Sequence, residues 1–195
     1  MLTTVYFIRH GQKAAAPGDP DLTSLGIKQA EQTAHYFKNF KINALYASPY
    51  QRTIQTAKII ASQLNLPVHN SYLLRERLNW EKGTFADFWQ EWQKTDLNRN
   101  YQPLSGRSSF QTGKEVKNFI DQLDLHKNQS IIIVTHGGTI GDFLRVAFPV
   151  ELLPQLINQE SGAKYLNILE CSITEIETNN RQYILKRINF TRHLK

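Results

Sequence analysis

The chain has 195 residues, of which 41% are hydrophobic and 21% charged, and its formal net charge is +6. This balance is typical of an ordinary soluble globular protein, and no apolar stretch is long enough to span a membrane. The single cysteine, Cys171, excludes an internal disulfide and any cysteine-rich metal site. We therefore expect one domain over residues 1–195, in a reducing cytoplasmic compartment and without a leader segment.

The excess of basic residues points to anionic partners, because positive charge speeds the encounter with them. The sequence contains no run of five or more lysines and arginines, and no zinc-finger or RNP-type spacing. We therefore expect small phosphorylated molecules rather than nucleic acid as partners.

The first strand and helix are predicted near the N-terminus. Residues 4–8 form a run of β-branched and aromatic side chains, which is typical of a buried strand. Glycine and proline over 11–21 predict a loop. Thr23 is the expected N-cap of a helix whose apolar face would hold Ile27, Ala30, Ala34 and Phe37.

A second strand and helix are predicted from residue 44 onward. Residues 44–48 resemble the first strand, and a helix follows to about Leu64, with Ser48 as its cap and Pro49 as its first residue. A short strand is expected within 66–74.

Residues 78–108 differ in composition from the rest of the chain, because they hold all three tryptophans. We interpret this segment as an insertion or cap with one helix near 86–95. The tryptophans Trp80, Trp89 and Trp92 are expected to pack the interior of this insertion rather than to form a platform for a substrate.

The second half predicts a helix over 110–123, a strand over 130–135 and a helix from about Thr139. Paired strands over 164–176 and 183–189 would flank a hairpin turn. The alternation of strands and helices predicts a three-layer α/β/α sandwich with a mostly parallel central sheet.

Two predicted strands end in a histidine followed by glycine, at His10 and His136. In open α/β sheets, ligands bind just beyond the carboxyl ends of the strands, so the two histidines should lie at one edge. Arg9 precedes the first histidine, and Arg52 lies in the first turn of a helix, whose N-terminus itself attracts anions. This much positive character in one cleft favours a phosphoryl group, which arginine binds in bidentate fashion.

The motifs resemble those of the histidine phosphatase superfamily, the phosphoglycerate mutase-like proteins. The resemblance covers nearly the whole chain and rests on collinear motifs, which are Arg9-His10-Gly11, Leu22-Thr23-Ser24-Leu25-Gly26-Ile27-Lys28-Gln29-Ala30, Ser48-Pro49-Tyr50-Gln51-Arg52-Thr53-Ile54-Gln55-Thr56-Ala57, Leu74-Arg75-Glu76 and Val134-Thr135-His136-Gly137-Gly138. It implies a phosphoglycerate mutase-like fold and a metal-independent phosphomonoesterase with no cofactor. The phosphatase branch of the family fits better than the mutases, which carry a Trp-Asn pair that this chain lacks.

The resemblance also implies roles for individual residues. His10 would be the nucleophile that becomes phosphohistidine, and Arg9, Arg52 and His136 would bind the phosphoryl oxygens beside Gly137. Glu76 would protonate the leaving oxygen and then activate water. Phosphate, sulfate and vanadate would be ligands of this site.

Two positions depart from the family pattern. Lys13 and Ala16 stand where many members have Thr or Ser and then Asn, and we expect Lys13 to replace the missing phosphate contact. Arg107 replaces an acid in a Gly-Glu-Ser motif and would add positive charge near the mouth of the site.

The role of Glu76 as the acid has two alternatives. Glu76 would form a plain surface ion pair with Arg75 or Arg77, or Glu81 would be the acid in its place.

Two other functions stay open beside a phosphatase acting on a small metabolite or a phosphoprotein. One is a phosphoglycerate-type mutase, which shares the first half-reaction. The other is a catalytically silent binder of phosphorylated ligands, which would keep its function without His10. The oligomeric state is also open, although the C-terminal hairpin offers a sheet edge through which two copies could pair.

Overall fold

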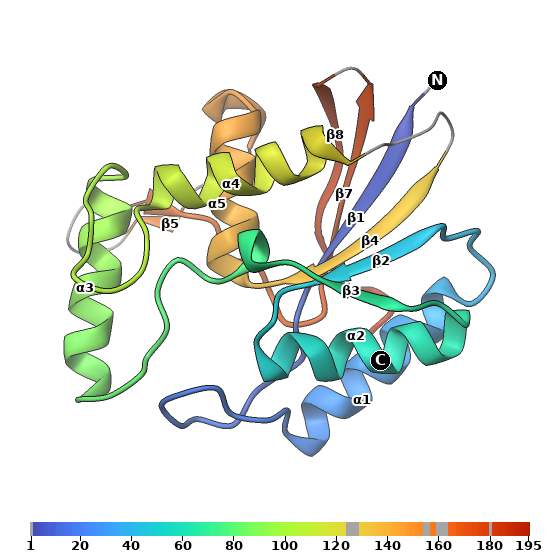
Figure 1. The fold of residues 1–195 in the computed structure, drawn as a ribbon, viewed down its shortest axis with the longest axis horizontal. Helices are drawn as coiled ribbons and strands as arrows, with labels where there is room; N and C mark the ends of the chain where they lie inside the picture. Colours follow the sequence, from blue (N-terminus) through green and yellow to red (C-terminus); the bar gives the residue numbers. More distant parts are fainter. Residues whose placement is uncertain (1, 124–128, 154–156, 159–163, 180) are drawn as a thin grey trace.

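A computed structural model describes residues 2–123, 129–153, 157–158, 164–179 and 181–195, and Figure 1 shows its fold. The strands of the six-stranded sheet are β1 (Thr3–Arg9), β2 (Ala44–Ala47), β3 (Val68–Asn70), β4 (Ser130–Thr135), β7 (Ile173–Asn179) and β8 (Gln182–Phe190), in the order β3-β2-β4-β1-β7-β8. The first four pair in parallel, whereas β7 and β8 are antiparallel. The predicted mostly parallel sheet and C-terminal hairpin are confirmed.

The helices lie on both faces of this sheet. They are α1 (Ser24–Phe37), α2 (Gln51–Leu64), α3 (Phe85–Leu97), α4 (Ser109–Gln122) and α5 (Gly137–Ala147). Two short 3-10 helices lie at Tyr72–Leu74 and Val150–Leu152. The strands β5 (Ile157–Asn158) and β6 (Lys164–Tyr165) form a small separate sheet. Among the described residues no helix is long and apolar enough to cross a membrane.

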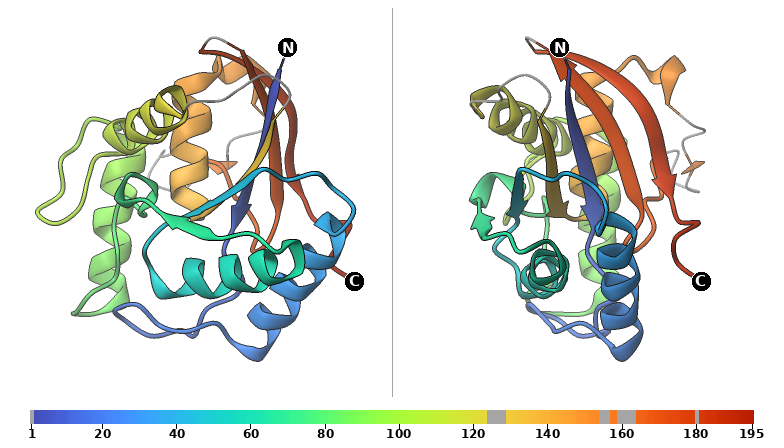
Figure 2. Two further views of the ribbon diagram at one scale, coloured as in Figure 1. Left: turned by 45° about the vertical axis from the view of Figure 1, so that its right-hand side comes forward. Right: turned by 90° about the vertical axis from the view of Figure 1, so that its right-hand side faces the viewer.

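The alternation of side chains along β1 explains the layers. Val5 and Phe7 belong to one buried cluster with residues of α4 and α5, whereas Tyr6 and Ile8 belong to another with residues of α1 and α2. Successive side chains of a strand point to opposite faces, so β1 supplies both cores. Figure 2 shows α1 and α2 side by side on one face of the sheet. The expected three-layer sandwich is therefore confirmed.

The start of α2 differs from the prediction. The helix begins at Gln51 with Tyr50 as its N-cap, and Tyr50 makes no capping hydrogen bond with its side chain. The Ser48 hydroxyl lies instead 2.8 Å from Nε2 of His136, and the Asp19 carboxylate accepts the first free helical N–H, that of Gln51, at 2.6 Å. The Ser48 side chain, which the local sequence predicts to cap the helix, therefore makes a tertiary contact with His136 instead.

Three further details differ. Ile27 is 43% exposed, and the buried residue in the first turn of α1 is Gly26, where a Cβ would lie 2.1 Å from the Gln12 carbonyl. Helix α5 begins at Gly137 rather than near Thr139. The single strand expected over 164–176 is divided in two, because residues 164–165 form β6 of the small separate pair and β7 begins only at Ile173.

Candidate active site

The two histidines lie side by side at the carboxyl edge of the sheet. Arg9 of β1 is in register with Thr135 of β4, so the residues that follow them, His10 and His136, leave the sheet together. Their ring centroids are 5.3 Å apart, and the two side chains are buried. The sequence expectation that parallel neighbouring strands bring these residues to one place is confirmed.

His10 is held as a neutral imidazole. Its Nδ1 lies 2.7 Å from the carbonyl oxygen of Gly11, which can only accept, so Nδ1 carries the hydrogen and Nε2 carries the lone pair. Burial lowers the pKa of His10 well below its usual value, and the neighbouring Arg9 and Arg52 lower it further. A neutral imidazole with a free Nε2 lone pair is the form that can attack phosphorus.

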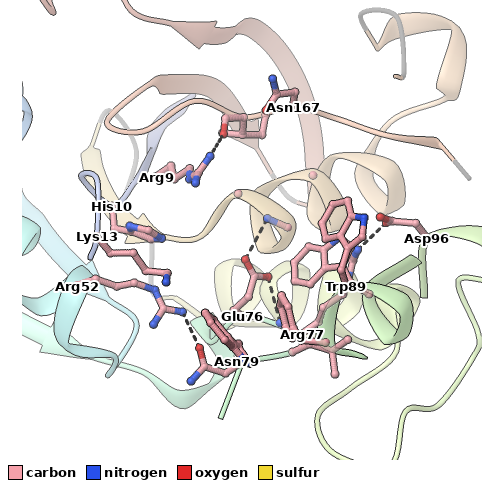
Figure 3. Close-up of a pocket in the computed structure, with 18 of the residues that line it drawn as sticks. Arg9, His10, Lys13, Arg52, Glu76, Arg77, Asn79, Trp89, Asp96 and Asn167 are labelled. Carbon is pink, nitrogen blue, oxygen red and sulfur yellow. Dashed lines mark hydrogen bonds and ion pairs between the residues drawn. The ribbon is translucent and has the colours of Figure 1, made fainter. Parts of the chain in front are cut away.

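Arg9 is fixed by a segment from the far end of the chain. Its Nη1 donates to the Ile168 carbonyl at 2.5 Å, and its Nη2 forms an ion pair of 2.7 Å with Glu170. Figure 3 shows Arg9 beside His10 with the first of these bonds. Sequence reasoning missed Glu170, because this acid carries no motif and meets Arg9 only in the folded chain.

Arg52 lies in the first turn of α2 and is 3% exposed. Its guanidinium lies 4.7 Å from the centroid of the Tyr50 ring, donates to Asp19 at 3.1 Å and donates to Asn79 at 3.2 Å. Asp19 and Asn79 are two further residues that no sequence motif singled out.

Three buried nitrogen atoms near His10 lack a partner among the described residues. They are Nε of Arg9, Nε of Arg52 and Nδ1 of His136. Burial lowers the pKa of His136 well below its usual value, with Arg52 adding to the effect, so this ring is also neutral. Because Ser48 occupies Nε2 of His136, a hydrogen on Nδ1 would be available to an incoming oxygen. Buried polar groups without partners are costly, and an anion would satisfy them.

Glu76 lies between the sheet edge and α3, and it is not the surface ion pair considered above. Its carboxylate accepts hydrogen bonds from the Gly138 N–H at 3.2 Å and from the Thr139 hydroxyl at 3.1 Å. Burial raises the pKa of Glu76 above its usual value, although the Arg77 charge opposes this. The alternative acid, Glu81, is exposed and accepts a hydrogen bond from Asn79.

Arg107 is not at the mouth of the site, contrary to the sequence expectation. It is 7% exposed, pairs with Glu115 and donates to the carbonyl of Arg75 at 2.5 Å and to that of Glu76 at 3.4 Å. Its charge is therefore neutralised inside the protein, where it holds the backbone of the Glu76 segment.

Lys13 and Gly137 both line the same cavity as the residues above. Burial lowers the pKa of Lys13, and the neighbouring Arg52 and Arg9 lower it further. Its Nζ donates to the Ala14 carbonyl at 3.3 Å.

Within the described ranges, no group of three or more His, Cys, Asp or Glu side chains is arranged to hold a metal ion.

The cavity has a volume of about 280 Å³ and two unlike ends (Figure 3). Arg9, His10, Lys13 and Arg52 lie at one end, and Trp89 and Asp96 lie at the other, with Glu76 between them. All three tryptophans line this cavity. Trp80 and Trp89 also contact Phe85, and Trp92 contacts Phe88, so the expected packing within the 78–108 segment is only part of their arrangement. Their sequence spacing shows an apolar helix face but not what that face meets.

Comparison with known proteins agrees with the motifs. Residues 5–191 match the histidine phosphatase superfamily (branch 1). The chain is 30% identical over 151 residues to the "Putative phosphoserine phosphatase 2" of Hydrogenobacter thermophilus, covering 70% of this chain and 74% of that protein. It is 26% identical over 189 residues to the "Probable phosphoglycerate mutase GpmB" of Yersinia pestis, covering 89% of this chain and 84% of that protein.

Among solved structures, the mycobacterial glucosyl-3-phosphoglycerate phosphatase is similar with a TM-score of 0.77 and 18% identity, over 98% of this chain and 100% of that one. That protein is also known in complex with inorganic phosphate and with vanadate. At this identity the likeness shows the fold. The matched residues, the fold and the 30% identical relative together establish that the chain belongs to branch 1 of the histidine phosphatase superfamily.

Proposed function

We propose that the protein hydrolyses a phosphomonoester of a small molecule through a phosphohistidine formed on His10. The family and the relatives named as phosphatases support the activity of a phosphoric monoester hydrolase. The observation that carries the mechanism is the neutral His10 ring, with its lone pair on Nε2, among the unpartnered nitrogens of Arg9, Arg52 and His136.

In the first half-reaction, Nε2 of His10 attacks phosphorus while the bond from phosphorus to the leaving oxygen breaks. The N–H groups of Arg9, Arg52 and His136 bind the phosphoryl oxygens and stabilise the charge that develops on them. Glu76, whose pKa is raised by burial toward the protonated form, gives its proton to the leaving oxygen.

In the second half-reaction, the Glu76 carboxylate takes a proton from a water molecule, which attacks the phosphohistidine. The N–P bond breaks, His10 recovers its lone pair, and inorganic phosphate leaves. Glu76 is then protonated again, so the cycle closes without another proton donor.

The first test is the hydrolysis of p-nitrophenyl phosphate by the wild type and by His10→Ala, with and without EDTA. We expect activity that EDTA does not change and that the variant lacks. An acid-labile, alkali-stable phosphoenzyme should form in the wild type alone. Turnover by His10→Ala equal to that of the wild type would overturn the mechanism.

Phosphoryl transfer to a second substrate hydroxyl, in preference to water, would identify the mutase alternative. A wild type that binds vanadate but turns over no monoester would identify the silent binder.

Lys13 is proposed as a substitute for the phosphate-contacting Asn of other family members. It lines the cavity with Arg9 and Arg52, and burial, together with these two charges, lowers its pKa. Lys13→Ala should raise the Michaelis constant by roughly tenfold, and an unchanged constant would remove Lys13 from the site.

A further inference from the structure

Helix α3 presents an aromatic face to the cavity. Phe85, Phe88, Trp89 and Trp92 follow one another at the spacing that puts side chains on one side of a helix, and all four line the cavity together with Trp80. Phe85 is 55% exposed and Trp89 is 36% exposed. Large aromatic side chains that stay open to a cavity mark a binding surface rather than a core.

This face does not pack into the interior of the protein. Among the described residues, neither of the two buried hydrophobic clusters contains a residue of α3. The helix is held at its last turn by charge, because Asp96 forms an ion pair of 2.6 Å with Arg77, whose guanidinium lies 4.0 Å from the centroid of the Trp92 ring. The aromatic face is therefore fixed in place and still available to a ligand.

The charged groups at this end of the cavity are already paired with one another. Arg77 bonds to Asp96 and to Asp142, and Arg145 bonds to Asp142 at 2.6 Å. A carboxylate on the substrate would have to compete with these buried ion pairs. The far end of the cavity is therefore poorly suited to a phosphoserine-like or phosphoglycerate-like alcohol.

A cationic alcohol is also disfavoured, although aromatic cages bind quaternary ammonium groups in other proteins. Of the acids that line the cavity, Asp96 is paired with Arg77, and burial raises the pKa of Glu76, which favours its uncharged form. Among the described lining residues no unpaired carboxylate therefore attracts a cation to the aromatic face, and a flat apolar group fits best.

We infer that the natural substrate is a small phosphomonoester whose alcohol carries an aromatic ring, which packs against the wall formed by Trp80, Phe85 and Trp89. This inference rests on the proposed function, since the phosphoryl group is placed at His10. Offset or edge-on ring contacts provide the specificity, and the positively charged end provides the anchor.

The test compares benzyl phosphate with ethyl phosphate, phosphoserine and phosphocholine, which are all esters of alkyl alcohols. We expect kcat/KM for benzyl phosphate to exceed that for ethyl phosphate by about tenfold or more. Trp89→Ala should lower this ratio by roughly tenfold, whereas Trp89→Phe should keep most of it. Leu97→Ala is the matched control, because Leu97 is 61% exposed on the same helix and does not line the cavity.

Binding is measured separately with benzylphosphonate and ethylphosphonate, which the enzyme cannot hydrolyse. All three tryptophans of the chain line the cavity, so their fluorescence reports its occupancy directly. Benzylphosphonate should bind about tenfold more tightly and perturb the fluorescence more.

Equal kcat/KM for benzyl and ethyl phosphate, or a preference for phosphocholine or phosphoserine, would overturn the inference. Tighter binding of benzylphosphonate without turnover of any ester would support the aromatic site and overturn the proposed phosphatase. A phosphotyrosine peptide hydrolysed faster than free phosphotyrosine would overturn the assignment to a small molecule.

Discussion

Asp19 and Arg52 form an ion pair of 3.1 Å at the start of α2, so Arg52 has an anion beside it before any substrate arrives. The other oxygen of the same carboxylate accepts the Gln51 N–H at 2.6 Å. Arg52 is buried, whereas Asp19 is exposed. A phosphoryl group that binds Arg52 must therefore share it with Asp19.

Replacing Asp19 with asparagine should strengthen phosphate binding. The change removes one negative charge near the anion but keeps an oxygen that can accept from Arg52, and we expect the inhibition constant of inorganic phosphate to fall about three- to tenfold. The gain should shrink at high salt. Asp21→Asn is the control, because Asp21 accepts from Gln55 instead. Weaker phosphate binding by Asp19→Asn would mean that this carboxylate chiefly orients Arg52.

Glu76→Gln should lower kcat by about 10²–10⁴, because it removes the proposed proton donor. The raised pKa of Glu76 keeps this acid protonated to a higher pH than usual, so wild-type activity should fall as pH rises through that pKa. This limb of the profile should be absent in the variant. Glu81→Gln tests the alternative acid, and a larger loss in that variant than in Glu76→Gln would reverse the assignment.

Arg107 should act as a positioning residue for Glu76, because its guanidinium donates to the carbonyls of Arg75 and Glu76. Arg107→Gln should lower kcat roughly tenfold with little change in KM, since a displaced acid affects chemistry more than binding. It should also shift the alkaline limb of the pH profile, which a purely structural loss would not do. Arg107→Lys should recover part of the rate, and a change in KM alone would contradict this role.

Breaking the buried ion pairs at the last turn of α3 should destabilise the protein. Arg77 is 1% exposed and bonds to Asp96 and Asp142, so Arg77→Met leaves two buried carboxylates that share Arg145 in place of two arginines. We expect a loss of about 3–5 kcal/mol, which corresponds to a fall in Tm of roughly 6–20 °C. Arg75→Met is the control, because the Arg75 guanidinium lies over the Tyr72 ring outside these pairs. Equal melting temperatures for Arg77→Met and the wild type would refute this account.

Stability should fall as the solution is acidified below about pH 6.5, the ordinary pKa of histidine. Burial depresses the folded-state pKa values of His10 and His136, so the unfolded chain binds protons first. Their contribution to the free energy of unfolding is present above the unfolded pKa and is lost as pH falls toward the folded values. Melting temperatures measured from about pH 8 to about pH 5, roughly 1.5 units on either side of that pKa, would check the predicted loss of stability. Vanadate should reduce the loss, because an anion beside the rings favours their charged form.

The elements that the sequence predicted well are those in which local pattern and tertiary environment agree. The apolar runs that became β1 and β4 are buried on both faces, and such runs have few other stable arrangements. Because parallel neighbours end at the same edge, the sequence alone places His10 and His136 together.

Three of the failures share one cause, which is a contact with a part of the chain distant in the sequence. Ser48 has the chemistry of an N-cap but bonds to His136, 88 positions later. Arg107 has the chemistry of a surface charge but is buried against the carbonyl of Arg75. Trp89 and Trp92 have the spacing of a core face, yet they meet a cavity. In each case the local sequence shows which interactions the side chain can make, and only the fold determines which partner it meets.

The register of β1 links folding to turnover. Val5 and Phe7 fill one core while Tyr6 and Ile8 fill the other, and His10 follows the last residue of the strand, Arg9. A slip of one residue would send each of these core side chains to the wrong face and would move the proposed nucleophile, His10, by about 3.3 Å. A chain refolded with β1 out of step could still have its full helix content and yet be inactive. Recovered turnover, rather than recovered circular dichroism, is therefore the measure of correct strand pairing in this protein.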